Sequence, residues 1–81
     1  MNRYNTLTSL GDNLVKLIAK SLVPVHILDY KVYYEAYLQQ MEYHKKHFKK
    51  TGKTAVAATV AEHYNISERT MFSVIAFMEG E

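Results

Sequence analysis

Few side chains of this sequence have the type and spacing of a chemical site, and two histidines come closest to a metal-binding pair. His44 and His47 lie three residues apart on one predicted helix, as two metal ligands can. The sequence contains no cysteine and no H-E-x-x-H pattern, and no third ligand follows at a recognised spacing. We therefore expect surface or half-buried histidines and no metal site.

A second candidate is the segment TGKT at residues 51–54, which has the letters that end a phosphate-binding loop. The first glycine of that loop would fall at position 47, which is His47, and only glycine lets the backbone approach a phosphate. No serine has a histidine and a carboxylate at a spacing that defines a catalytic triad. We therefore expect no catalytic residue, no cofactor and a non-enzymatic protein.

Lysines near the middle of the chain could bind a polyanion instead. With no acid among them, they form a local positive field. Lysines near a helix C-terminus also complement its dipole without any ligand, so phosphate contact and a solvated helix end both remain open. The residues are Lys45, Lys46, Lys49, Lys50 and Lys53.

The charge is divided unevenly along the chain, although its net value is only +2. Over residues 1–54, nine Lys or Arg residues oppose four acids, a balance of +5. From residue 55 onward Arg69 alone opposes four acids, a balance of −3. A polyanion would thus be attracted mainly by the first two thirds of the sequence.

The composition predicts a small all-α domain. A chain of 81 residues forms one domain at most, and three glycines with one proline provide too few turns for a sandwich or barrel. The best N-terminal apolar segment, residues 14–25, is interrupted by Lys16 and Lys20 and cannot span a membrane. We expect a soluble, cytoplasmic protein that does not bind membranes.

Apolar spacing predicts four helices, and the first two cover residues 10–22 and 25–50. Ser9 and Asp12 form a capping-box pattern at the start of the first. Pro24 cannot continue that helix, so the second begins just after it. Thr51 and Gly52 follow the second helix as its stop signal.

The second helix carries a stripe with the a and d spacing of a heptad repeat. The stripe could pack against the rest of its own chain, as amphipathic helices of small domains do, or form the seam of a homodimer across residues 27–48. We favour the first interpretation and keep the second open. The stripe consists of Ile27, Tyr30, Tyr34, Tyr37, Met41, His44 and Phe48.

The last two predicted helices cover residues 54–64 and 67–79, with Thr54 and Ser67 as their caps. Asn65 follows the first of them at a position that requires positive φ, which asparagine tolerates. Ile66 should then enter the core. The expected inner faces are Val56, Ala57, Val60, Ala61 and Tyr64 on one helix and Met71, Val74, Ile75 and Met78 on the other.

The order Ala61, Asn65, Ile66, Ser67 resembles the helix-turn-helix family of bacterial and phage regulators, especially the sigma-factor-like, resolvase and transposase variety. The matched pattern reads A-x-x-[aromatic or apolar]-x-[IV]-S-x-x-T-[apolar] and covers about residues 54–78. The resemblance implies a sequence-specific protein for double-stranded DNA, a transcription regulator or site-recognition protein of phage or mobile-element type.

In that family the second helix lies in the major groove. Carried over to this sequence, the base-reading residues are Glu68, Arg69, Phe72 and Ser73. Arg69 could bond both acceptors of guanine, Glu68 could accept from cytosine, and Phe72 could pack on a thymine methyl. The phosphate contacts would come from Ser67 and Thr70 together with the five lysines.

A second function remains open, in which the same helical fold serves as an interaction or assembly module without binding DNA. Phe72 and Phe77 are expected at the surface, where large apolar side chains often mark protein interfaces. The acidic balance after residue 55 also favours a protein partner over DNA.

Overall fold

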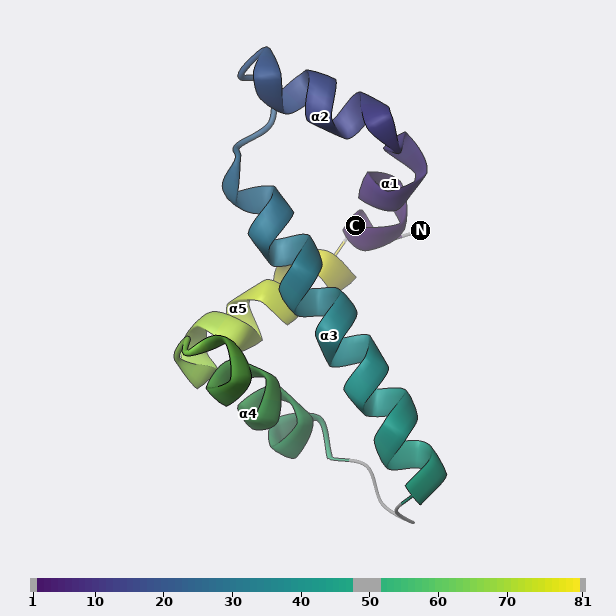
Figure 1. The fold of residues 1–81 in the computed structure, drawn as a ribbon, viewed down its shortest axis with the longest axis vertical. Helices are drawn as coiled ribbons and strands as arrows, with labels where there is room; N and C mark the ends of the chain where they lie inside the picture. The colour runs from purple at the N-terminus through teal and green to yellow at the C-terminus, as the bar shows by residue number, and fades with distance from the viewer. Residues whose placement is uncertain (1, 48–51, 81) are drawn as a thin grey trace.

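The computed structural model in Figure 1 describes residues 2–47 and 52–80, and within them every regular element is helical. The all-α prediction is thus confirmed. The described residues contain five helices: α1 (Arg3–Leu10), α2 (Asp12–Ala19), α3 (His26–His47), α4 (Lys53–Tyr64) and α5 (Glu68–Glu79).

The helix predicted over residues 10–22 corresponds to α2, which is shorter, and α1 was not predicted. Gly11 has φ 54° and ψ −129°, a conformation that side-chain-bearing residues rarely adopt, so it separates α1 from α2. Asn2 caps α1 by accepting a hydrogen bond from the backbone N–H of Asn5 at 2.8 Å. Ser9 lies inside α1 and donates to the Thr6 carbonyl, so the expected capping box does not start a helix.

The end of α2 also differs from the prediction, at Ala19 rather than residue 22. Ser21 adopts φ 59°, and the backbone N–H of Leu22 bonds the Leu17 carbonyl at 2.9 Å, which closes the helix before Pro24 is reached. A short loop then leads to α3, which begins one residue later than expected. The predicted end of that helix at residue 50 lies outside the described residues.

Helix α4 begins at Lys53 and not at a Thr54 cap. The N-cap position is occupied by Gly52, which has no side chain to accept a hydrogen bond. The capping role predicted for Thr54 is therefore wrong. The end of α4 and the start of α5 agree with the predicted ranges within one residue. Differences of that size are ordinary at helix ends.

The hydrophobic core lies between α3, α4 and α5. The inner faces predicted for the last two helices are confirmed, with Tyr64 and Ile66 partly buried at the core edge. The alanines of α4 let the neighbouring helices approach closely. The buried cluster consists of Tyr34, Tyr37, Val56, Ala57, Val60, Ala61, Met71, Val74, Ile75 and Met78.

The heptad stripe of the long helix belongs to this core. Tyr34 and Tyr37 are buried in the cluster, and Tyr30 and Met41 pack against it. A homodimer seam along residues 27–48 would need the same side chains at the surface, so the stripe is used within the chain. Phe48, its last member, lies outside the described residues.

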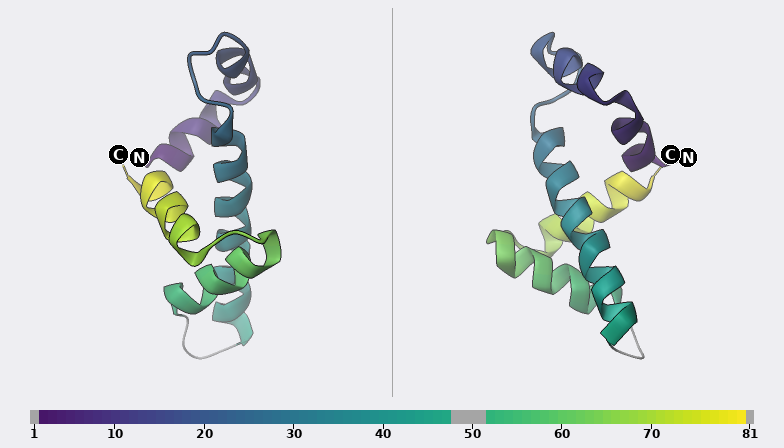
Figure 2. Two further views of the ribbon diagram at one scale, coloured as in Figure 1. Left: turned by 90° about the vertical axis from the view of Figure 1, so that its left-hand side faces the viewer. Right: turned by 45° about the vertical axis from the view of Figure 1, so that its right-hand side comes forward.

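Helix α1 closes the core at the far end of α5. Tyr4 packs on Tyr34 with ring centroids 4.9 Å apart, and Leu7 is partly buried against the core. The backbone N–H of Arg3 donates to the Gly80 carbonyl at 2.7 Å. Both views in Figure 2 accordingly show the two ends of the chain side by side.

Helix α2 lies away from the three-helix core. In Figure 1 it lies at the top, linking α1 to the start of α3, while α4 and the α4–α5 turn lie at the lower left. Leu14 is the buried residue of α2, and it lies outside the main core cluster. Most of the α2 surface is consequently exposed.

Candidate nucleic-acid interface

The turn between α4 and α5 is fixed by backbone hydrogen bonds. Asn65 has φ 56° and ψ 44°, the left-handed conformation expected from its position. The N–H of Ile66 bonds the Ala61 carbonyl at 2.9 Å, and the N–H of Asn65 bonds the Glu62 carbonyl at 3.2 Å. These two bonds form a Schellman motif, which satisfies carbonyls at the end of α4.

A side-chain cap begins α5 directly after the turn. The Ser67 hydroxyl accepts a hydrogen bond from the Thr70 N–H at 3.0 Å, as predicted for an N-cap. The same hydroxyl donates to Thr70 Oγ1 at 2.8 Å. Only Ile66 separates the left-handed residue from the cap, so the direction of α5 relative to α4 is closely determined.

The two faces of α5 differ sharply. The face toward the core carries Met71, Val74 and Met78, each with no exposed surface. The opposite face is exposed over the first two turns of the helix. We call its four predicted base-reading residues the α5 ridge: Glu68, Arg69, Phe72 and Ser73.

The α5 ridge combines charge, polarity and one large apolar side chain. Phe72 is 40% exposed. Glu68 and Arg69 are both exposed, and their opposite charges nearly cancel over this turn. The Ser73 hydroxyl donates to the Arg69 carbonyl at 3.0 Å, so it is already bonded within the helix. Arg69 is therefore the ridge residue whose donors best suit a base edge.

The structure places one predicted phosphate-contacting lysine away from the ridge. Lys53 Nζ lies 3.9 Å from Glu79 Oε1, so Lys53 is beside the last turn of α5, whereas Glu68 and Arg69 occupy its first. Twelve helical residues extend about 18 Å. Lys45 and Lys46 are exposed in the last turn of α3, and Lys49 and Lys50 lie outside the described residues.

Phe77 does not have the open surface expected of it. Its ring is partly buried, with the Arg3 guanidinium 4.7 Å from its centroid and the Tyr30 ring at 5.7 Å in an edge-on contact. Arg3 also donates from Nη1 to the Phe77 carbonyl at 3.1 Å. Of the two phenylalanines proposed for partner binding, only Phe72 is exposed. Arg3 was not singled out from the sequence, because its partner is 74 residues away.

A small polar cluster lies where α3 meets the end of α5. The Tyr34 hydroxyl donates to Glu79 Oε2 at 3.1 Å. Burial, together with this hydrogen bond, raises the pKa of the Tyr34 phenol to about 12. Burial likewise raises the pKa of Tyr37, whose hydroxyl has no hydrogen-bond partner among the described residues. This cluster fixes the C-terminal end of α5 and takes no part in the ridge.

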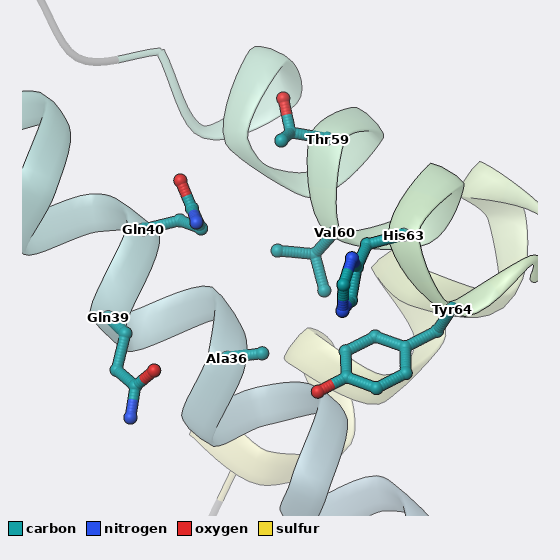
Figure 3. A pocket seen from close by; sticks show the side chains of 7 residues that line it. All are labelled: Ala36, Gln39, Gln40, Thr59, Val60, His63 and Tyr64. Carbon is teal, nitrogen blue, oxygen red and sulfur yellow. The ribbon is translucent and has the colours of Figure 1, made fainter.

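An open hollow lies between α3 and α4 (Figure 3). Its volume is about 210 Å³, below the 300–1,000 Å³ typical of sites for organic ligands. None of the predicted site residues lines it. Its lining comes from α3, with Gln39 and Gln40, and from α4, with Thr59 and His63, and in Figure 3 the Gln39 amide points away from α4.

The described residues contain no group of three or more His, Cys, Asp or Glu side chains that could hold a metal ion. His44 and His47 both contact the Tyr43 ring, with centroids 6.0 and 4.4 Å from it. No helix in residues 2–47 or 52–80 has the length and apolar content needed to cross a membrane.

Comparisons with models of protein families, with curated proteins and with solved structures give no match to this chain.

Proposed function

We propose that this protein binds double-stranded DNA, with α5 in the major groove and the α5 ridge against the base edges. The observation that carries the proposal is the pairing of a rigid α4–α5 turn with a solvent-facing first half of α5. A helix that enters a groove must project from its domain at a fixed angle, and this turn provides that constraint. Because residues 54–78 resemble the helix-turn-helix family of bacterial and phage regulators, we infer a transcription regulator or DNA-site-recognition protein of phage or mobile-element type.

Two features of α5 favour contact with a phosphate backbone at its first turn. The unpaired N–H groups and dipole at a helix N-terminus attract anions, and Arg69 adds a full charge there. Ser67 and Thr70 bring hydroxyl groups to the same turn. Glu68 opposes phosphates unless it accepts a bond from a base, so it contributes selectivity more than affinity.

The exposed lysines supply attraction that does not depend on DNA sequence. Lys45, Lys46 and Lys53 are exposed at the neighbouring ends of α3 and α4. In helix-turn-helix proteins the first helix of the motif crosses the backbone, and Lys53 begins the corresponding helix here. The small number of such residues indicates modest affinity for each copy of the chain.

The test is selection of bound sequences from a random DNA pool, followed by affinity measurements on the recovered site. Arg69→Ala should weaken binding to that site by about 1–3 kcal/mol and relax the preference at one base pair. Lys53→Ala should weaken all sequences alike and lower the salt slope by about 1. Lys16→Ala on α2 removes the same charge away from α5 and is the matched control.

A pool that yields no preferred sequence would exclude specific recognition. Equal losses for Arg69→Ala and Lys16→Ala would show that only total charge matters, and the assignment of Arg69 as a base reader would fail.

The exposed Phe72 ring favours a second candidate, an assembly module that binds another protein through the same face of α5. Aromatic side chains are enriched at the energetic centres of protein interfaces. Elution from heparin in a salt gradient separates the two candidates. Late elution that depends steeply on salt supports DNA, and elution at low salt supports the protein partner.

A further inference from the structure

Exposed apolar side chains concentrate at the end of the molecule opposite the α4–α5 turn. The described residues contain seven large hydrophobic residues classed as exposed, and five of them lie between residues 15 and 32. We call these five the α2–α3 patch: Val15 (60% exposed), Leu22 (69%), Val25 (68%), Leu28 (38%) and Val32 (49%). The α4–α5 turn and its ridge do not contribute to it.

Sequence position and the start of α3 bring several of these residues together. Leu28 and Val32 are four residues apart and share one face at the start of α3, and Val25 is in the turn directly before that helix, where its carbonyl accepts a hydrogen bond from the Leu28 N–H at 3.1 Å. Leu22 is in the loop before them, three residues from Val25, and Val15 is on α2. Figure 1 shows α2, this loop and the start of α3 together at the top of the molecule.

The exposed area is large for so small a protein. Applied to the ordinary surface areas of valine and leucine, the exposed fractions give on the order of 500 Å² of apolar surface, within the range of the largest patches on monomers. When two copies cover the same patch, about 1,000 Å² is buried, which reaches the lower limit of specific interfaces.

Charges of both signs border the patch. Lys16 on α2, Lys20 at the C-cap of α2 and Asp29 on α3 are exposed in the same part of the chain as its apolar residues. A two-fold arrangement can place the lysines of one copy near the aspartate of the other, giving an apolar centre with a polar rim.

We propose that the α2–α3 patch is the interface of a two-fold homodimer, in which each copy covers the patch of the other. This contact differs from the seam considered along the heptad stripe, whose Tyr34 and Tyr37 are buried in the core and whose Tyr30 and Met41 pack against it. It does not depend on DNA binding. We expect a weak dimer, with a dissociation constant on the order of 10 µM, because an interface at the lower limit of size leaves little free energy once the cost of association is met.

The first experiment measures the mass of the intact chain by light scattering across a concentration series. One chain has a mass of 9.4 kDa. We expect a mass about 1.8 times that value near 100 µM and within about 20% of it near 1 µM, as a dissociation constant of about 10 µM requires. A single-chain mass throughout the series would overturn the proposal, whether or not the protein also binds anionic vesicles or another protein.

Charge substitutions then locate the contact. Leu22→Glu places like charges opposite each other in a two-fold interface and should weaken the dimer at least tenfold. Phe72→Glu makes the same kind of change at an exposed apolar residue outside the patch, on the α5 ridge, and should leave the dimer unchanged. A dimer lost with Phe72→Glu but kept with Leu22→Glu would overturn the assignment. Far-UV circular dichroism verifies that both variants keep their helices.

Cross-linking supplies a test that leaves the core untouched. The sequence has no cysteine, so Val25→Cys gives each copy one reactive thiol in the middle of the patch. A short thiol-specific cross-linker should join two copies of this variant and should not join two copies of a Ser73→Cys control on the α5 ridge. Equal cross-linking of the two variants would contradict the proposed contact.

Discussion

Replacing Tyr37 by phenylalanine should stabilise this protein, because the hydroxyl of Tyr37 is buried without a hydrogen-bond partner among the described residues. The residue is 2% exposed and lies in the core beside Tyr34, with ring centroids 5.8 Å apart. A buried hydroxyl that makes no bond costs about 1–3 kcal/mol of folding free energy. The substitution removes that group and keeps the ring.

The expected gain follows from two opposing effects. Loss of one oxygen leaves a void of about 10–15 Å³, which at 24 cal/mol per Å³ costs about 0.3 kcal/mol. Relief of the unpaired hydroxyl outweighs this, so we expect the free energy of unfolding to rise by about 1 kcal/mol. For a domain of this length, that corresponds to about 4–8 °C in the melting temperature.

Tyr34→Phe is the matched control, since it removes the same atom from a neighbouring core tyrosine. The Tyr34 hydroxyl donates to the Glu79 carboxylate at 3.1 Å, so its loss should lower the free energy of unfolding by about 1–2 kcal/mol. Urea titrations followed by circular dichroism at several temperatures give both values. Equal slopes in denaturant would show that neither change alters the surface exposed on unfolding.

The prediction is that Tyr37→Phe raises the free energy of unfolding and Tyr34→Phe lowers it. If Tyr37→Phe lowers the free energy of unfolding by more than about 0.5 kcal/mol, the hydroxyl makes a stabilising bond in solution and the reasoning fails. If both variants are destabilised equally, the distinction between the two tyrosines is wrong.

Two further predictions concern pH and the α4–α5 turn. Because the pKa of Tyr34 rises from 10.0 in the unfolded chain to about 12 in the folded one, its contribution is complete below pH 10 and is lost as the pH rises toward 12. Urea titrations of the parent and of Tyr34→Phe from pH 9 to 12 should show a smaller decline for the variant, and parallel curves would contradict this. At the turn, Asn65→Gly should leave thermal stability within about 0.5 kcal/mol of the parent, whereas Asn65→Ala should lower it by about 1 kcal/mol, because alanine pays more for the left-handed conformation. A loss with Asn65→Gly as large as that with Asn65→Ala would show that the asparagine side chain, rather than its φ, determines the turn.

The second half of the fold could be predicted from the sequence because its signals are local. Asn65 and Ser67 determine where α4 ends and α5 begins through bonds that span three to five residues. The inner faces of both helices follow from the period of their apolar residues. These features require no knowledge of the rest of the molecule.

The first half was predicted less well because apolar spacing alone does not determine helix limits. The leucines continue at helical intervals through Gly11, whose positive φ separates α1 from α2, so the predicted range 10–22 covers α2 and leaves out α1. In the sequence, Gly11 is the residue that marks this boundary. Ser21, with φ 59°, gave no comparable sign of where α2 ends.

Long-range contacts account for the differences at the candidate site. The sequence of α5 alone predicts Phe77 at the surface, but in the fold Arg3 of α1 packs against its ring. In the sequence Lys53 belongs to one basic cluster with the other four lysines, but in the fold it lies beside Glu79. The exposed α5 ridge was predicted correctly because the opposite face of the same helix is continuously apolar.

The bond between Arg3 and Gly80 has a practical consequence for labelling. Reporters attached ahead of residue 3 and behind residue 80 would emerge at one corner, beside α1 and the last turn of α5. A donor and an acceptor fluorophore at these positions would transfer energy efficiently while α1 stays docked. The transfer could be lost at a lower denaturant concentration than the helical circular dichroism signal. The difference would measure how independently α1 and α2 detach from the core of α3, α4 and α5.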